Sequence, residues 1–193
     1  MTAQSLIDST KPLLSQTQIS GEDGILLTYL NFAKNQIAQD TLSWLGGEEI
    51  TMTTDSVYTL SVMPIQIIDM YDSQLNIMER NSYNTNGYFQ ISPTEIKINN
   101  PIDGNKIYIN YYYTPSDYEL SDEVTVPLTL QNAIQYFIAH KSFETYRSEK
   151  EIFSSTEYYK KYKASVTEYL YTTDTLSTDS LVKVDMIKNK CLV

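Results

Sequence analysis

Hydrophobic positions follow a helical period near the start and end of the chain and a strand period between them. From residue 21 to 45, apolar side chains recur every three or four positions, which predicts an amphipathic helix. Ser20, followed by Asp23, predicts the start of this helix, and Gly46 with Gly47 predicts its end. A shorter helix is expected within residues 3–16, with a kink or break at Pro12.

From about Glu49 to Thr114 the period changes from near 3.6 to 2, and β-branched and aromatic residues become frequent. Turn signals interrupt this region at residues 84–87, 92–94 and 100–105. The pattern predicts one small antiparallel sheet of about five or six strands. In its last strand, alternation places Ile107, Ile109, Tyr111 and Tyr113 on one face and Tyr108, Asn110 and Tyr112 on the other. We expect the first face to supply the core and the second to be available to a partner.

Helical signals return after an acidic loop. Thr125 ahead of Pro127 indicates a capped helix, and Leu130, Ile134, Phe137 and Ile138 indicate its buried face, which Phe143, Tyr146 and Ile152 are expected to extend. Ser154 with Glu157 resembles a capping box that opens a second helix, whose apolar stripe contains Tyr159, Tyr162 and Val166. We therefore predict an antiparallel helical hairpin joined near residues 153–155.

The last segment departs from this pattern. A polar linker precedes LVKVDMIKN, in which Val182, Val184 and Met186 alternate with Lys183, Asp185 and Ile187. Such a segment is typical of an extended peptide that docks on another surface. The predicted organisation is N-terminal helices (1–48), a β insertion (49–114), an acidic loop with a helical hairpin (115–172), and a linker with an extended arm (173–193). The predicted fold class is α+β: a helical bundle with an inserted antiparallel sheet and a C-terminal arm.

The net charge and the cysteine content exclude several classes of function. A formal charge of −10 repels phosphate backbones, so tight nucleic-acid binding is not expected, whereas a conduit to which DNA must not adhere suits this charge. The single Cys191 allows no internal disulfide and no thiolate metal cluster. Neither a signal peptide nor a membrane span is evident, so we expect a protein made in the cytoplasm. The 17 tyrosines suit surfaces that are wet before assembly and buried afterwards.

The sequence offers little chemistry for catalysis. His140 is the single histidine and no nucleophile elbow is present, so a hydrogen-bonded or surface histidine is the default interpretation. Four acids precede the second helical region, where capping and solvation account for them better than metal binding: Asp117, Glu119, Asp122 and Glu123. Near residue 160, lysines are interspersed with tyrosines. We expect the tyrosines to form an apolar stripe in the core and the lysines to face solvent. We therefore expect no catalytic residues, no metal and no cofactor.

Three stretches together resemble the head-to-tail adaptor proteins of tailed bacteriophages. They are LLTYLNFAKNQIAQDTLSWL, the run from IYINYYYTPSDYELSDEVTVP into LTLQNAIQYFIAHKSFETYR, and the final 20 or so residues. The resemblance covers about residues 20 to 193 and is strongest to the tail-accessory type of short-tailed phages, with ring proteins of crAss-like phages as one possible subgroup.

This resemblance implies a ring, commonly dodecameric, beneath the portal of the capsid, with a lumen through which DNA passes. It implies a portal-binding arm, with seven candidate residues: Leu181, Val182, Lys183, Val184, Asp185, Met186 and Ile187. The tyrosine-rich strand suggests a contact with a neighbouring subunit or the next tail protein through Tyr108, Tyr112 and Tyr113. The protein would then be located at the head–tail interface of the virion. Two alternatives stay open: a Tyr-faced binding module for carbohydrate or a host surface, and a small acid–base hydrolase.

Overall fold

The computed structural model describes residues 1–14, 18–145 and 149–176, and the chain divides into two compact units. The first, here called the helical unit, contains Met1–Thr41 and the described residues from Pro115 onwards. The second, the β unit, spans Leu42–Thr114. The mixed α+β class expected from the sequence is confirmed.

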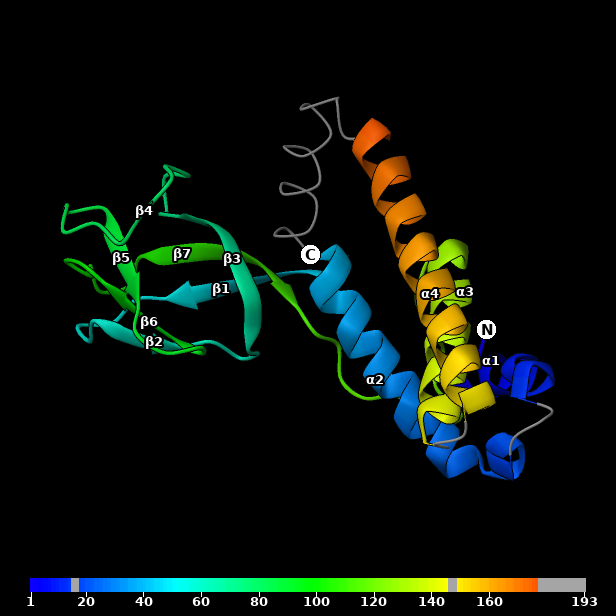
Figure 1. The fold of residues 1–193 in the computed structure, drawn as a ribbon. Helices are drawn as coiled ribbons and strands as arrows, with labels where there is room; N and C mark the ends of the chain where they lie inside the picture. Colours follow the sequence, from blue (N-terminus) through cyan, green and yellow to red (C-terminus); the bar gives the residue numbers. More distant parts are fainter. Residues whose placement is uncertain (15–17, 146–148, 177–193) are drawn as a thin grey trace. The chain divides into compact units, whose positions relative to one another are not determined.

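Four α-helices and two short 3₁₀ turns form the described part of the helical unit (Figure 1). They are α1 (Ala3–Thr10), η1 (Lys11–Leu14), η2 (Gln18–Gly21), α2 (Asp23–Thr41), α3 (Leu128–Glu144) and α4 (Glu149–Leu176). The third helix, α3, packs against α1, α2 and α4, so its buried side chains, which include Leu130, Ile134 and Ile138, form the centre of the unit. Pro12 lies in the 3₁₀ turn directly after α1, as its missing N–H predicts.

The second helix is shorter than predicted and turns a different face inward. It ends at Thr41 rather than at the two glycines, because Leu42 adopts a left-handed conformation (φ 49°) and the chain is already extended from Leu45. Its buried side includes Leu26, Leu30 and Ile37, whereas the apolar Phe32 is 51% exposed. Apolar residues occur on both sides of this helix, so their period alone did not distinguish the core face.

The helical hairpin is confirmed, but its joint lies elsewhere. Helix α3 ends at Glu144 and α4 begins at Glu149, so the turn precedes residues 153–155. Ser154 is inside α4, where its hydroxyl donates to the carbonyl oxygen of Lys150 (3.1 Å), and it caps nothing. The expected buried role of Ile152 is also wrong, since this side chain is 54% exposed. The packing of Phe143 on Tyr158 and of Phe137 on Tyr162 shows that the two helices run antiparallel.

Seven strands form two sheets in the β unit, where one sheet was predicted (Figure 1). Their bounds are β1 (Leu45–Thr51), β2 (Val57–Thr59), β3 (Pro64–Tyr71), β4 (Glu79–Arg80), β5 (Gly87–Gln90), β6 (Glu95–Ile98) and β7 (Lys106–Tyr113). One sheet has the order β1-β7-β3 and the other β2-β6-β5-β4. All pairings are antiparallel except that of the short β4 with β5, which is parallel and corrects the all-antiparallel expectation. The three predicted turn regions do fall between strands.

A single apolar core joins the two sheets. Its members come from β2, β3, β5, β6, β7 and adjoining loops and include Tyr58, Ile67, Met70, Ile96, Ile98, Ile107 and Ile109. Within this core, Gly46 of β1 lies opposite Tyr111, and a Cβ at residue 46 would approach Cε2 of the Tyr111 ring to 2.7 Å. The glycines that were expected to end a helix are therefore strand residues, and Gly46 makes room for an aromatic ring.

Candidate assembly surfaces

The acidic loop that leads into α3 is held by a buried lysine. Lys34 is fully buried in α2, and its Nζ donates to the carbonyl oxygens of Pro115 (2.8 Å) and Ser116 (2.7 Å) and to Asp117 Oδ1 (2.8 Å). Asn31, one turn earlier, exchanges two hydrogen bonds with the backbone of Tyr118. Because a buried ammonium requires several acceptors, these contacts fix the start of the loop on α2.

The same loop also orders the N-terminus. The backbone amides of Ala3 and Gln4 donate to the carbonyl oxygens of Asp122 and Leu120, and Val124 donates to that of Met1. Asp122 accepts from the amide of Glu119 through its carboxylate (2.8 Å). The prediction that the loop acids and Thr125 cap α3 is wrong, because Pro127 occupies the N-cap and no side chain caps this helix. The acids therefore shape the loop itself.

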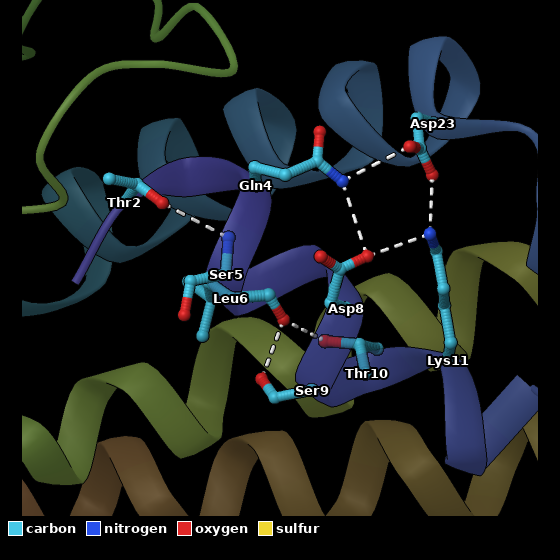
Figure 2. A network of polar contacts seen from close by, with 9 residues as sticks. All are labelled: Thr2, Gln4, Ser5, Leu6, Asp8, Ser9, Thr10, Lys11 and Asp23. Carbon is cyan, nitrogen blue, oxygen red and sulfur yellow. Dashed lines mark hydrogen bonds and ion pairs between the residues drawn. The ribbon is translucent and has the colours of Figure 1, made fainter.

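A polar cluster ties α1 to the beginning of α2 (Figure 2). Lys11 Nζ lies between the carboxylates of Asp8 (2.7 Å) and Asp23 (2.8 Å), and the Gln4 side chain donates to both acids (3.2 and 3.0 Å). Hydrogen bonds from Lys11, and then from Gln4, lower the pKa of both carboxyl groups. The cluster is solvent-accessible, so it orients the two helices rather than supplying much stability.

A second cluster joins α2 to α4. Tyr162 is completely buried, and its hydroxyl donates to Asp40 Oδ2 (2.6 Å), which also accepts from Lys163 Nζ (2.9 Å). Burial raises the pKa of Asp40, but the hydrogen bonds from Tyr162, Lys163 and Gln36 outweigh it, so the net shift is downward. Burial and the Asp40 carboxylate together raise the pKa of Tyr162. The cluster therefore keeps a neutral phenol and a charged carboxylate in contact.

His140 has a structural role in the described helices. Its Nδ1 lies 2.9 Å from Ser155 Oγ and 3.1 Å from the Ser155 carbonyl oxygen, and its ring packs against Phe137 and Tyr159. Burial lowers the pKa of this imidazole. These contacts link α3 to α4 and agree with the default interpretation of the sequence. Tyr162 and Val166 are buried as predicted, while the lysines of this region, among them Lys161, are exposed.

The tyrosine-rich strand β7 is the central strand of its sheet. Exposure along it alternates only in part, because Asn110, on the face expected to be available to a partner, is itself buried. Ile107, Ile109 and Tyr111 are buried in the core, and Tyr113 packs against that core with its ring edge-on to Tyr111. Tyr108 and Tyr112 are half-buried on the opposite face, here called the outer face. Of the three tyrosines expected to contact a partner, two therefore share the outer face and Tyr113 lies on the inner one.

Register shows what surrounds the two outer tyrosines. Tyr108 lies between Tyr71 and Glu49, and Tyr112 lies between Gln66 and Leu45. Glu49 forms an ion pair with Lys106 (2.6 Å), and the hydrogen bond between them raises the pKa of Lys106. The outer face thus combines aromatic rings, which protein interfaces enrich, with an amide and a carboxylate group. Sequence reasoning identified the tyrosines but not their cross-strand neighbours.

The predicted arm, with its seven candidate residues Leu181, Val182, Lys183, Val184, Asp185, Met186 and Ile187, lies outside the described residues, as does Cys191. The structure therefore does not test these residues. Among residues 1–14, 18–145 and 149–176, no group of three or more potential ligands is placed to hold a metal ion. In the same ranges, no helix combines the length and hydrophobicity needed to cross a membrane.

Comparison with known proteins places these features in a family. None of the curated proteins compared with the chain matches it. The profile of the family described as SU10 adaptor protein matches residues 1–183, which includes both structural units and the first residues of the predicted arm. The resemblance to phage head-to-tail adaptor proteins is thereby confirmed: the chain belongs to the SU10 adaptor protein family.

Proposed function

We propose that the protein is a structural subunit of a ring, expected to be a dodecamer, that joins the phage portal to the tail and extends the DNA channel. The observation that carries this proposal is the family match over residues 1–183. Membership of an adaptor family supports a role as a virion component without enzymatic activity. Partners would be further copies of the chain, the portal and the next tail protein.

The portal contact is assigned to the arm. Helix α4 ends at Leu176, and 17 residues follow it in the sequence. Within them, the alternation of Val182, Val184 and Met186 with more polar residues suits an extended peptide that adds to a partner's surface. The family match ends at residue 183, so part of this arm belongs to the stretch shared with the family.

The charge of the chain suits the channel role. A formal charge of −10 gives a ring of many copies a strongly acidic surface, and few cations are available to bind phosphates. Four acids are concentrated in the loop before α3: Asp117, Glu119, Asp122 and Glu123. An acidic lumen would let DNA pass without adhering to it.

Mixing the purified protein with the portal from the same phage tests the proposal. Mass photometry and negative-stain imaging should show a symmetric ring on the portal, with one copy number per complex. A protein that stays unbound at micromolar concentration, with a correctly assembled portal, would contradict the adaptor function. The protein alone serves as the reference for spontaneous assembly.

Variants of the arm test whether this segment, rather than another part of the protein, binds the portal. Deletion of residues 177–193 leaves α4 complete and should abolish portal binding while far-UV circular dichroism and thermal unfolding stay unchanged. A variant with Val182, Val184 and Met186 changed to serine should show the same loss. The control changes Lys150, an exposed lysine of α4 outside the arm, to serine and should keep portal binding. Equal binding by all variants would exclude the arm as the portal contact.

One observation favours a second function, a carbohydrate-binding face. On the outer face, Tyr108 lies beside Glu49 and Tyr71, which combines rings for stacking with a hydrogen-bonding carboxylate. A glycan array with the purified protein tests this, with Tyr108→Ala as the negative control. Specific glycan binding without any portal binding would favour this alternative over the adaptor ring.

A further inference from the structure

A pocket of about 220 Å³ in the β unit is lined by the loops that follow β1, β3, β4 and β6. Its apolar lining comprises buried side chains of the core and an exposed one, namely Met52, Met78, Ile98, Ile107 and Ile102. Its polar lining comes from loop residues on both sheets, including Asp72, Thr85, Asn86, Asn100 and Asn105. We call it the tip pocket. It gives direct access from solvent to core methyl and methylene groups.

The polar lining carries almost no free charge. Asp72 is the one charged residue in the lining, and its carboxylate accepts from the amides of Gln74 (2.8 Å) and Asn76 (2.9 Å) and from the Asn76 side chain (3.0 Å). By contrast, the side-chain amides of Asn100 and Asn105 have no partner within the described part of the chain. The pocket therefore offers uncharged donors and acceptors, which suit a peptide backbone better than an anion.

Three exposed aliphatic side chains lie in or beside the loops that line the pocket. Leu75 is 63% exposed, Ile77 64% and Ile102 60%. Ile102 lines the pocket, and Leu75 and Ile77 are next in sequence to the lining residues Gln74 and Met78, so these loops present apolar groups to water. Leu75 also has a left-handed backbone (φ 63°), which is unfavourable for a leucine. Asn100 (φ 49°) and Gly104 (φ 79°) have similar conformations in the loop opposite. Leu75 combines an unfavourable backbone conformation with an exposed apolar side chain. We infer that this side chain serves a contact with another molecule rather than the stability of the β unit.

We propose that the tip pocket is the docking site for an uncharged loop of the next tail protein, which inserts one apolar side chain. This inference rests on the proposed adaptor function. At about 220 Å³, the pocket is below the usual range for drug-sized ligands and suits one anchoring side chain. The Asn100 and Asn105 amides would hydrogen-bond the backbone on either side of that anchor.

The size of the site favours a tail protein over a second copy of the chain. A permanent ring contact usually buries thousands of Å² of accessible surface, far more than one small pocket and three exposed aliphatic side chains of its loops provide. A ring repeats the site in every subunit, however, so a tail protein that reaches several copies gains affinity by avidity. The tail protein should therefore bind portal-mounted rings much more tightly than single subunits.

The test uses rings assembled on the portal and the purified tail protein of the same phage, with binding measured by biolayer interferometry. Leu75→Gly removes an exposed apolar side chain next in sequence to the lining residue Gln74 and suits the left-handed backbone, so it does not threaten folding. Combined with Ile102→Ser, it should weaken tail binding at least about tenfold. Ile91→Ser is the matched control, because Ile91 is 52% exposed on the same unit but neither lines the pocket nor adjoins a lining residue in sequence.

The outcomes separate this inference from the function on which it rests. Normal rings with weakened tail binding, and normal tail binding for the control, would support the tip pocket. Normal rings with unchanged tail binding would overturn it and leave the adaptor function intact. Rings that fail to form with the double variant, but form with the control, would show that a second copy occupies the pocket. Absence of wild-type rings on the portal would contradict the adaptor function itself.

Discussion

The helical unit and the β unit differ in the contacts that fix the relative positions of their helices and strands. In the described chain, four of the five buried polar or charged residues lie in the helical unit: Thr10, Lys34, Ser142 and Ser155. The β unit has one, Asn110, and its core is otherwise apolar apart from tyrosine hydroxyls. Strands are aligned by hydrogen bonds between their backbones, whereas helices satisfy their backbones internally. Side-chain contacts such as that of His140 with Ser155 must therefore help to fix how the helices meet, and the contacts of Lys34 fix a loop on α2.

The largest expected effect comes from the apolar core of the β unit. Ile107 is completely buried on β7, so Ile107→Ala should lower the free energy of unfolding by about 4 kcal/mol. Urea denaturation followed by circular dichroism measures the change. The exposed Ile91→Ala on the same unit should cost less than about 0.5 kcal/mol. A small effect at Ile107 would mean that the two sheets do not share a tight core.

Removal of the Lys34 ammonium should have a slightly smaller effect on the helical unit. Lys34→Met keeps the packing volume but leaves two loop carbonyls and Asp117 without their donor. We expect a loss of about 3 kcal/mol, since three hydrogen bonds from a buried charged donor are lost. Hydrogen exchange should show increased opening of residues 115–124. Lys160→Met, which removes an exposed lysine of the same unit, is the control and should change little.

The Asp40 cluster should contribute about 2 kcal/mol, because its hydrogen bonds involve a charged acceptor. Asp40→Ala should lower unfolding free energy by that amount, and a double-mutant cycle with Tyr162→Phe should show coupling between the two. The pKa of Asp40 is lowered in the fold, so its contribution is present above the ordinary carboxyl pKa of about 3.9. Stability should be lost as pH falls through the lowered pKa. A difference between wild type and variant that grows at low pH would contradict this assignment.

The smallest expected effect is a gain in stability rather than a loss. Leu75 has a left-handed backbone, which costs L-residues roughly 1–2 kcal/mol, so Leu75→Gly should raise the thermal stability of the β unit slightly. The greater freedom of glycine in the unfolded chain offsets part of this gain. Differential scanning calorimetry would measure the shift. A clear destabilisation would mean that the Leu75 side chain packs within its own chain rather than awaiting a partner.

Periodicity alone was enough to identify the order of the main elements. The change from a period of 3.6 to 2, the turn signals and, in part, the alternation along β7 correspond to observed structure. These features depend on neighbouring residues, whose chemistry is visible in the sequence. Caps and ends were predicted less well: Gly46 is in a strand and Ser154 is inside a helix, because tertiary pairing overrode the local signal.

The tertiary structure alone decided which residues meet. No local pattern indicates that a lysine in the middle of α2 is buried, since its acceptors lie 81 to 83 positions later in the chain. Likewise, Asp40 meets Tyr162 across 122 positions, and the tip pocket gathers side chains from loops of two sheets. Such contacts depend on how the helices and strands pack, which the spacing of residues along the sequence does not predict. The sequence by itself thus determined the elements, the charge and the family resemblance, while packing determined the polar contacts and the pocket.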